Sequence, residues 1–357
     1  MLLKRKLCIA ASFCGVVFFM FATHTIQKNS VLNVQMEAPP TTPRPQLKNH
    51  TRARVQTPPV RRRTCSCSTC ISDPGESDWF DRRYDSSQHP YLTNQDQPID
   101  PTALKWWLAL QRSVDGTMEE VMRKMFSVIS PPPGEELNPA GRCRTCAVVG
   151  NSGNLRDSKY GELIDAHSIV FRMNKATTVG FERDVGNKTT HHFMYPESAV
   201  DLQPGVHLVL LPFKLRDLQW VTSALSTGEI KTTYTRVKER VQAEKDKIIV
   251  VNPGFFKYTH DHWTEHHGRY PSTGMLAIVF ALHLCDEVSV FGYGADLQGN
   301  WHHYWEENRY AGAFRKTGVH DADFESKIIQ TLNSERKIKL YPQTEKLSDP
   351  ELRERNE

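Results

Sequence analysis

The chain has 357 residues, of which 39 % are hydrophobic and 24 % are charged, which suits one large folded domain with appendages. Its formal net charge of +4 is unevenly distributed, because residues 1 to 64 contain 11 Lys and Arg residues against one acidic residue, and the remainder contains 34 against 40. A mildly acidic folded part argues against nucleic acid as a partner, since such binding needs basic charge on the folded surface.

The N-terminus has the pattern of a membrane signal. Lys4, Arg5 and Lys6 precede an uncharged apolar run, residues 7 to 22. Its length lies between the apolar region of a cleaved signal peptide, about 7–15 residues, and a membrane-spanning helix, about 17–25 residues. FATHT, at its end, is a poor cleavage site. We therefore expect a cytoplasmic tail over 1–6 and a signal-anchor over 7–23, with the rest lumenal; a cleaved signal peptide is the alternative.

A spacer follows the anchor. Residues 24–64 are rich in Pro, Thr, Gln and Val, and they end at Arg61-Arg62-Arg63, which is typical of an extended lumenal stem. Cleavage near these arginines would release a secreted form. The folded domain is expected over 65–357. Asn49, in the stem, and Asn187 each begin an Asn-X-Thr glycosylation signal.

Eight cysteines occur. Cys8 and Cys14 lie in the anchor, and the lumenal ones are Cys65, Cys67, Cys70, Cys143, Cys146 and Cys285. Two C-x-x-C pairs resemble halves of a zinc site, but the gap of about 70 residues between them exceeds the usual spacing of about 12–20. In an oxidising lumen we expect disulfides, whose pairing the spacing leaves open.

Strand and helix patterns alternate through the folded part. Seven short apolar or β-branched runs predict strands at 146–150, 168–174, 190–196, 207–213, 247–253, 287–294 and 337–342. Helical spacing of apolar residues predicts helices at 215–226, 273–285 and 323–335, and further helices within 78–130. This order indicates an α/β fold with a central sheet of about seven strands covered on both faces.

Polar loops follow several strands. CAVVGNSGNL runs from a buried strand into Gly150, Asn151, Ser152 and Gly153, where glycines would let a phosphate or sugar approach the backbone. Asn174 ends the next strand, and both loops could face one crevice. The pattern is not G-x-G-x-x-G, so a nucleotide site and an ordinary strand-to-helix turn both remain open.

The C-terminal third contains two further candidate segments. Ser272, Thr273 and Gly274 begin an apolar helix, where Ser272 or Thr273 could cap the helix or the helix start could bind an anion. Residues 299 to 325, GNWHHYWEENRYAGAFRKTGVHDADFE, gather His302, His303 and His320 with tryptophans and acids. These residues alone are compatible with a metal site, acid–base chemistry or a packed core.

Several of these motifs, in this order, resemble the sialylmotifs of animal sialyltransferases: CAVVGNSGNL with VFRMNKA, HHGRYPSTG with LCDEVSVFGYGAD, then GNWHHYWE and GVHDADFE. The match covers roughly residues 65 to 342. DWFD, WWLALQ, YPSTGM and WHHYWE most resemble the β-galactoside α-2,3-sialyltransferases that act on Galβ1-3GalNAc.

The resemblance implies an enzyme, a CMP-N-acetylneuraminate:β-galactoside α-2,3-sialyltransferase of the Golgi membrane with its catalytic domain in the lumen. It implies a single Rossmann-like GT-A variant domain that transfers sialic acid from CMP-sialic acid to galactose O3, with inversion and without a metal or cofactor. Galβ1-3GalNAc on glycoproteins or glycolipids would be the acceptor, and the enzyme could form a homodimer. The chemistry needs a base for the acceptor hydroxyl and donors for the leaving phosphate.

The resemblance also assigns roles to residues. His320 would be the base, and His303, assisted by Tyr234 and Tyr270, would stabilise the phosphate. The donor-binding residues would be Asn151, Ser152, Asn174, Tyr234, Tyr270, Ser272, Thr273, Gly274, Gly294, Trp301 and His302. Gln111, with Tyr270, would contact the acceptor galactose. The implied disulfides are Cys65–Cys70, Cys67–Cys143 and Cys146–Cys285.

Three alternatives are kept. The linkage could be α-2,6 or α-2,8, or the chain could be an inactive glycan-binding relative, although the presence of both His303 and His320 argues against inactivity. A zinc hydrolase that uses the His and Cys groups is the third, and it would lose activity with a chelator. His191 and His192 are expected to be structural, and the acids of DADFE either to orient His320 or to cap the following helix.

Overall fold

The computed structural model describes residues 65–68, 70–111, 116–133, 143–296, 299, 301–307 and 318–342, all within one compact unit, residues 61–357. The expected cytoplasmic tail, anchor and stem, with Asn49, lie outside the described residues. None of the helices in the described ranges is long and apolar enough to cross a membrane.

An eight-stranded sheet forms the centre, in the order β1-β6-β5-β4-β3-β2-β7-β8. The strands are β1 (Tyr91–Leu92), β2 (Thr145–Val149), β3 (Ile169–Met173), β4 (His191–Met194), β5 (His207–Leu210), β6 (Ile248–Val251), β7 (Glu287–Phe291) and β8 (Lys339–Tyr341). All neighbouring pairs are parallel except β1 with β6. The seven predicted strands are confirmed. The eighth, β1, was missed because two residues show no periodicity.

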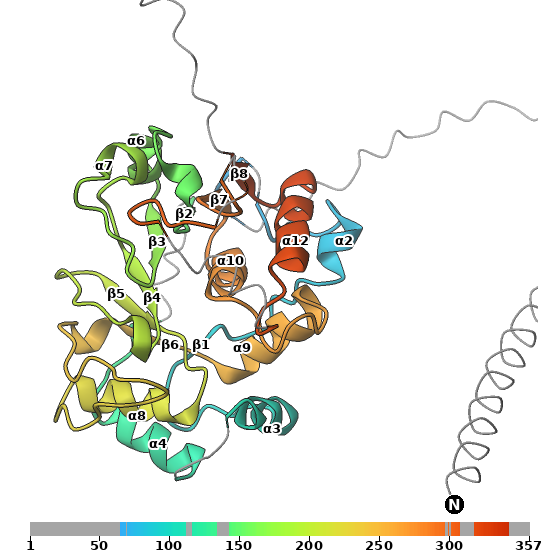
Figure 1. The fold of residues 1–357 in the computed structure, drawn as a ribbon. Coiled ribbons are helices and arrows are strands. Elements are labelled where there is room, and N and C mark those ends of the chain that lie inside the picture. The colour runs from blue at the N-terminus through green and yellow to red at the C-terminus, as the bar shows by residue number, and fades with distance from the viewer. Residues whose placement is uncertain are drawn as a thin grey trace, which may run out of the picture. The chain divides into compact units, whose positions relative to one another are not determined.

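Helices connect and cover the strands (Figure 1). They are α2 (Asp78–Asp81), α3 (Pro101–Ala109), α4 (Met118–Phe126), α6 (Gly161–Asp165), α7 (Glu182–Val185), α8 (Leu215–Ala224), α9 (Pro253–Tyr258), α10 (Thr273–Leu284) and α12 (Ala322–Ser334). Short 3-10 turns span Gly153–Leu155, Pro196–Ser198 and Lys245–Lys247, and one π-helical turn spans Thr259–Trp263. The predicted helices at 215–226, 273–285 and 323–335 correspond to α8, α10 and α12.

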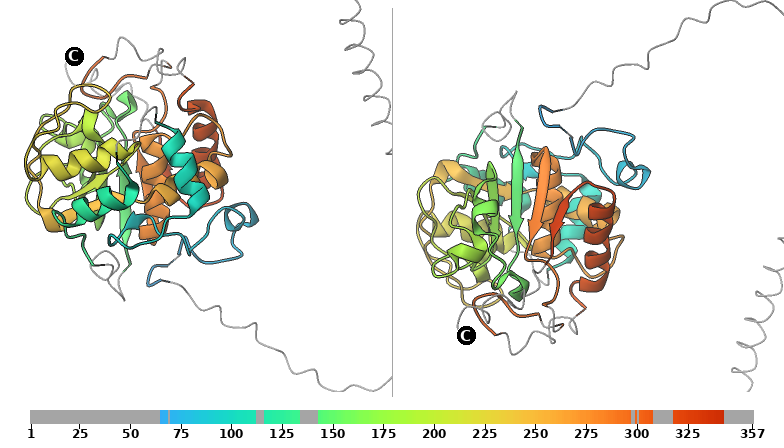
Figure 2. Two further views of the ribbon diagram at one scale, coloured as in Figure 1. Left: turned by 90° about the horizontal axis from the view of Figure 1, so that it is seen from below. Right: turned by 90° about the horizontal axis from the view of Figure 1, so that it is seen from above.

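Alternate residues of each strand enter different cores, as the period of two in a strand requires. Val148, Phe171 and Val209 pack on α9 and α10 in the largest core, while Ala147 and Val170 face a smaller core on the other side of the sheet. On that same side, beside β5 and β6, α4 and α8 close a third core around Trp220. α10 is apolar all round because it lies between the sheet and the outer helices, as both views of Figure 2 show.

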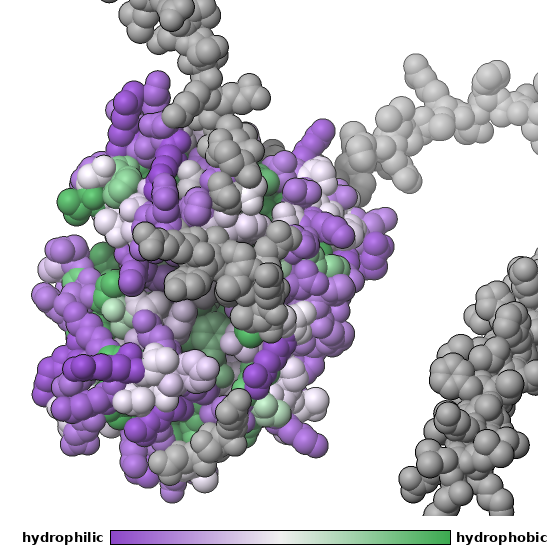
Figure 3. Space-filling view, in the orientation of Figure 1, coloured by the Kyte–Doolittle hydropathy of each residue, from purple (hydrophilic) through white to green (hydrophobic). Residues whose placement is uncertain are grey.

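On the face of the molecule shown in Figure 3, hydrophilic residues predominate and hydrophobic ones form small separate patches. Large hydrophobic side chains with exposed surface include Leu163, Val179 and Tyr234. Asn187 is exposed on the loop between α7 and β4, so its predicted glycosylation signal is sterically accessible.

Three disulfides join the cysteines in the same pairs that the resemblance implies: Cys65–Cys70, Cys67–Cys143 and Cys146–Cys285. Cys146 lies in β2 and Cys285 directly follows α10, so this bridge ties the first parallel strand to the central helix. In the described residues, the groups of three potential metal ligands involve Cys65, Cys67 and Cys143, whose sulfur atoms are already joined in these bridges.

The Cys146–Cys285 bridge should contribute more stability than the Cys65–Cys70 bridge. The two close loops with sequence separations of 139 and 5 residues, for which chain entropy predicts about 5 and about 2 kcal/mol. We expect the Cys146→Ser/Cys285→Ser protein to be inactive and poorly secreted. Chemical denaturation of both double variants measures the difference. Normal secretion and activity of the Cys146 variant would contradict the expectation.

Candidate active site

Between β2 and β7 the chain switches the side of the sheet to which it adds new strands. In open parallel sheets, a crevice forms at the carboxyl ends of the strands at such a switch point. From β2 the chain proceeds through β3 to β6 on one side, and β7 and β8 are added on the other. The loops after β2 and β7 leave the carboxyl ends of adjacent strands, so their side chains are brought together although about 140 residues separate them.

The two loops touch backbone to backbone at Gly150 and Gly292. A Cβ on Gly150 would lie 2.3 Å from the Gly292 oxygen, so no side chain fits there. Gly292 has φ +70°, and a Cβ on it would meet Leu155 at 2.4 Å. Glycine is therefore required at both positions.

Hydrogen bonds join the loop after β2 to the segment that follows β7. The Ser152 amide donates to the Gly292 carbonyl at 3.1 Å, and the Gly153 amide donates to the His302 carbonyl at 2.7 Å. The buried Asn154 side chain donates to the Tyr293 carbonyl at 2.7 Å. The glycine-rich loop thus holds the backbone of Gly292, Tyr293 and His302 in place.

Asn151 and Asn174 lie beside each other at the ends of β2 and β3. The Asn151 Nδ2 donates to the Met173 carbonyl at 3.0 Å, and Asn174 has the left-handed φ of +57° that asparagine tolerates. The Oδ1 atoms of both are buried without a hydrogen-bond partner among the described residues. An unpaired buried acceptor costs the desolvation of that group, so both atoms are suited to accept a hydrogen bond from a ligand or from water.

His192 contacts the backbone of Asn174. Its Nε2 lies 2.6 Å from the Asn174 carbonyl oxygen. Burial lowers the pKa of His192, so the ring is neutral and donates its Nε2–H to that carbonyl. The expectation that His192 is structural is consistent with this contact. Its neighbour His191 is also buried and stacks on His207 with centroids 4.6 Å apart.

The histidine-rich segment is fixed against the same loop. The Tyr304 amide donates to the Asn151 carbonyl at 3.1 Å, and the buried Tyr304 hydroxyl donates to the Thr177 carbonyl at 2.8 Å. Arg156 donates from Nε to the Tyr304 carbonyl at 2.7 Å and from Nη2 to the His303 carbonyl at 3.4 Å. Sequence reasoning did not identify Arg156 or Tyr304, because their roles depend on backbone carbonyls.

The His303 ring is half-exposed and oriented by two neighbours. Its Nδ1 lies 2.8 Å from the Glu306 Oε1, and its plane stacks on Trp305 with centroids 4.6 Å apart. Because a carboxylate only accepts, Nδ1 donates to Glu306, and Nε2 can face another partner.

The N-terminus of α10 is occupied by a carboxylate of the protein itself. Ser272 caps α10 by accepting from the Met275 amide, and it donates from its amide to Glu325 Oε1 at 2.7 Å and from Oγ to Oε2 at 2.5 Å. Burial raises the pKa of Glu325 to about 7. Glu325, on α12, therefore connects the Ser272–Gly274 segment to the helix that follows His320.

Thr273 and Gly274, in the first turn of α10, adjoin the end of β7. The Tyr293 hydroxyl donates to the Gly274 carbonyl at 3.1 Å, and a Cβ on Gly274 would lie 2.9 Å from the Tyr293 ring. Gly294 has φ +89°, and no atom of the described residues lies within 4 Å of the position of a Cβ. Gly294 therefore borders open space, while Gly274 is tightly packed.

His320 is mostly buried, and its Nδ1 lies 2.8 Å from the Tyr270 carbonyl oxygen. A carbonyl only accepts, so Nδ1 carries the proton and Nε2 keeps a lone pair. The Tyr270 ring meets the imidazole edge to face with centroids 5.0 Å apart. Burial lowers the pKa of His320, which keeps the ring neutral at lower pH. These are the properties of a general base.

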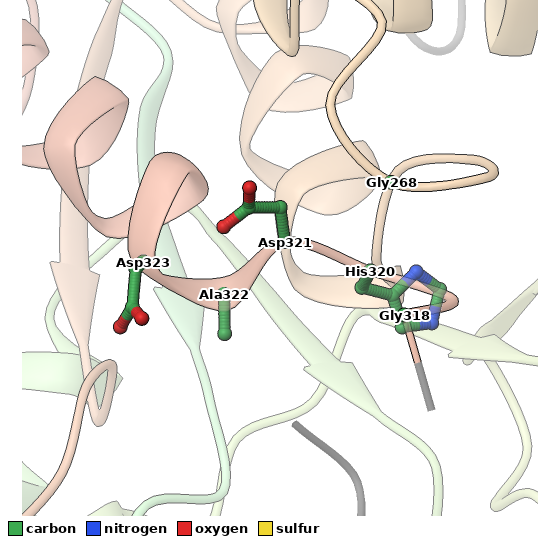
Figure 4. A pocket seen from close by; sticks show the side chains of 6 residues that line it. All are labelled: Gly268, Gly318, His320, Asp321, Ala322 and Asp323. Atoms are coloured by element: carbon green, nitrogen blue, oxygen red, sulfur yellow. The ribbon is translucent and has the colours of Figure 1, made fainter. Parts of the chain in front are cut away.

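A cavity of about 270 Å³ adjoins this histidine and is lined by Gly268, Gly318, His320, Asp321, Ala322 and Asp323. In Figure 4 the His320 ring and the Asp321 and Asp323 carboxylates point in different directions. Asp321 accepts from the Phe324 amide at 3.0 Å, so it caps α12. The capping role expected for the acids of DADFE is therefore filled by Asp321.

Gln111 follows α3 and contacts α8. Its Oε1 accepts from the Leu215 amide at 2.7 Å, while its Nε2 is buried without a partner in the described ranges. The fully buried Asp217 accepts from the Phe213 and Lys214 amides at the same helix start, and burial raises its pKa to about 7. Gln111 therefore has one structural contact and one free donor.

Tyr234 differs from the other predicted donor-binding residues because 84 % of its surface is exposed. Its amide donates to Glu197 Oε1 at 3.1 Å, and the same carboxylate accepts from Lys214 at 3.1 Å. The structure thus brings the Asn151, Asn174, Ser272 and His303 segments together, and it joins Tyr270 to His320. Tyr234 lies on the surface, and Trp301 and His302 are half-buried beside the β2 loop.

A family model described as glycosyltransferase family 29 (sialyltransferase) matches residues 91–337. The CMP-N-acetylneuraminate-beta-galactosamide-alpha-2,3-sialyltransferase 2 of Rattus norvegicus is 55 % identical over 283 residues, which cover 78 % of this chain and 80 % of that protein. Sialyltransferase 1 of the same description from Homo sapiens is 50 % identical over 285 residues, covering 79 % of this chain and 84 % of that protein.

Solved structures agree with these matches. A crystal structure of a mammalian sialyltransferase superposes with a TM-score of 0.73 at 47 % identity, covering 79 % of this chain and all of that chain. A second, in complex with Gal-beta-1-3GalNAc-ortho-nitrophenol, also has a TM-score of 0.73 at 47 % identity and covers 78 % of this chain and all of that chain.

The ionisation of Glu325 should make the protein less stable as the pH rises. Its pKa is raised from 4.5 to about 7, so above pH 4.5 the unfolded chain loses a proton that the folded chain keeps. Between pH 4.5 and 8 the free energy of unfolding should fall by about 3 kcal/mol more in the parent than in Glu325→Gln. Denaturant titrations at both pH values measure this. Equal falls would contradict the assignment.

Proposed function

The chain belongs to glycosyltransferase family 29, the sialyltransferases, and from this membership we propose that it transfers sialic acid from CMP-sialic acid to O3 of galactose in Galβ1-3GalNAc termini. The observation that carries the proposal is the pair of buried Oδ1 atoms of Asn151 and Asn174, which have no hydrogen-bond partner among the described residues and lie at the ends of the neighbouring strands β2 and β3. Ribose hydroxyls or the cytosine amine of the donor would supply the missing hydrogen-bond donors.

His320 is proposed to take the proton of the acceptor. The galactose O3 attacks C2 of sialic acid as the bond from C2 to the phosphate oxygen breaks, and the bonding electrons leave with CMP. The O3 proton passes to Nε2 of His320, whose Nδ1–H is held by the Tyr270 carbonyl. Attack from the face opposite the leaving group gives inversion at C2.

His303 is proposed to stabilise the phosphate as charge develops on it. His303 and His320 are assigned different roles because their Nδ1 atoms have different hydrogen-bond partners. The Tyr270 carbonyl accepts from Nδ1–H of His320 and so fixes the tautomer with the lone pair on Nε2, whereas the Glu306 carboxylate accepts from Nδ1–H of His303 and orients that ring. Tyr270 and the exposed Tyr234 would assist, and Tyr234 would have to be covered by the donor or by neighbouring chain.

The remaining donor contacts follow from the loops. Ser152, Thr273, Gly294, Trp301 and His302 would line the nucleotide pocket, with Ser272 and Gly274 acting through the start of α10. Ser272 already binds Glu325, so we propose that its part is to shape the helix start. The unpartnered Nε2 of Gln111 would donate to a galactose hydroxyl.

The setting of this reaction is also proposed. The expected anchor and stem would place the catalytic domain, 65–357, in the Golgi lumen as a type II membrane protein, glycosylated at Asn49 and Asn187. The reaction would need no metal, and the domain could form a homodimer. The relatives' α-2,3 specificity supports this linkage over α-2,6 or α-2,8, and the orientation of both histidines supports an active enzyme over a glycan-binding relative.

Replacement of His320 should abolish transfer. We expect His320→Ala to lower kcat at least 100-fold, because a positioned general base contributes about 10²–10⁴, with little change in affinity for CMP. Transfer to Galβ1-3GalNAc measures kcat, and calorimetry measures CMP binding. His89→Ala, at an exposed histidine of the N-terminal segment, is the control. Near-normal turnover of the His320 variant would remove it from the mechanism.

The pH dependence should report the environment of His320. The base works when neutral, and burial lowers its pKa below the ordinary value of 6.5. As the pH falls, kcat/KM should therefore decline only below about pH 6.5. A pH–rate profile from pH 4.5 to 8 checks this. A decline with its midpoint above pH 7 would show that the titrating group is not a buried histidine.

A further inference from the structure

The segment before Tyr270 crosses the segment that carries His320. The Arg269 amide donates to the Val319 carbonyl at 2.8 Å. Gly268 has φ +74°, and a Cβ on it would lie 3.0 Å from the His320 Cα, the Val319 oxygen and the Asp321 nitrogen. The two backbones are therefore in direct contact, and side chains beside this crossing can move His320.

The crossing segment is held at both of its ends. Glu265 forms an ion pair with Arg83, and the Arg269 guanidinium donates to the Leu110 carbonyl at 2.5 Å. Glu265 and His266 have φ of +47° and +65°, a conformation that non-glycine residues keep only where the surroundings impose it. As a result of this turn, the adjacent side chains of His266 and His267 contact different residues, Asp261 and Asp321.

His267 faces α12. Its ring lies parallel to that of Phe324, with centroids 3.7 Å apart and an angle of 7°. Its Nδ1 lies 3.0 Å from the Asp321 Oδ2, and the other oxygen of Asp321 accepts from the Phe324 amide. The pKa of Asp321 is lowered by this amide and by His267, so the carboxylate is charged and the ring nitrogen donates to it.

We infer that His267 is a positioning residue, which acts through Asp321 to hold His320 in the orientation for proton transfer. Asp321 is bonded on one side to α12 and on the other to His267, and His320 precedes it directly in the chain. With His267 removed, Asp321 keeps its cap but loses its lateral contact, so the His320 segment loses one of its restraints while those from Arg269 and Tyr270 remain. Small displacements of a reacting group have large effects on rate.

This inference rests on the proposed function. It predicts a change in kcat and not in the KM for CMP-sialic acid. His267 lies against α12 and the His320 segment, whereas the unpartnered Asn151 and Asn174 atoms lie at the ends of β2 and β3. Loss of His267 should therefore lower kcat and leave the KM for CMP-sialic acid unchanged. A residue needed only for folding would instead lower the amount of active protein and the melting temperature.

The test uses the full chain with three variants. We expect His267→Ala to lower kcat about tenfold, with KM for the donor within twofold. His267→Asn, whose amide can replace the Nδ1 donor to Asp321, should regain at least a third of the parent kcat. His266→Asn is the matched control, because His266 is adjacent, its side chain is 68 % exposed and it faces Asp261 instead. It should stay within twofold of the parent.

The kcat, CMP affinity and melting temperature of the three variants decide whether His267 is a positioning residue. The inference is supported if kcat falls in His267→Ala, recovers in His267→Asn and stays normal in His266→Asn, at unchanged CMP affinity. It is overturned if His267→Ala equals His266→Asn, if His267→Asn is no better than His267→Ala, or if CMP binding and melting temperature fall in parallel with kcat. If the parent chain itself fails to transfer sialic acid, the proposed function fails and not this inference alone.

Discussion

The close contact of Gly150 with Gly292 is the constraint on which the site depends. It lets the ends of β2 and β7 approach without side chains between them, so that one loop can hold the backbone of Tyr293, His302 and Tyr304. The Cys146–Cys285 bridge ties β2 to the far end of α10, whose first turn packs on Tyr293. Any side chain at Gly150 would separate the elements that carry the candidate donor-binding residues.

The two histidines differ through their partners more than through their positions. His320 donates to a backbone carbonyl in a buried place, and His303 donates to a carboxylate at a half-exposed one. Burial lowers the pKa of His320, which together with its neutral partner favours an uncharged base. Under the proposed function, one residue type would serve two different tasks in the same reaction.

Short apolar or β-branched runs predicted the seven longer strands, and helical spacing of apolar residues predicted the main helices. β1 was missed because two residues, Tyr91 and Leu92, contain no period. Candidate site residues came from motif order, and a helix cap by the acids of DADFE was open from the sequence, but no spacing showed that Ser272 binds Glu325 or that Asp321 binds His267. Such contacts join segments about 50 residues apart, and only the folded chain reveals them.

Product analysis is the most direct test of whether the protein transfers sialic acid to O3 of galactose in Galβ1-3GalNAc. The full chain is incubated with CMP-sialic acid and Galβ1-3GalNAc in excess EDTA, and the linkage in the product is determined by NMR. The account predicts sialic acid α2-3 linked to galactose, at the same rate with and without the chelator. An α2-6 or α2-8 product, or loss of turnover in EDTA that added zinc restores, would contradict it.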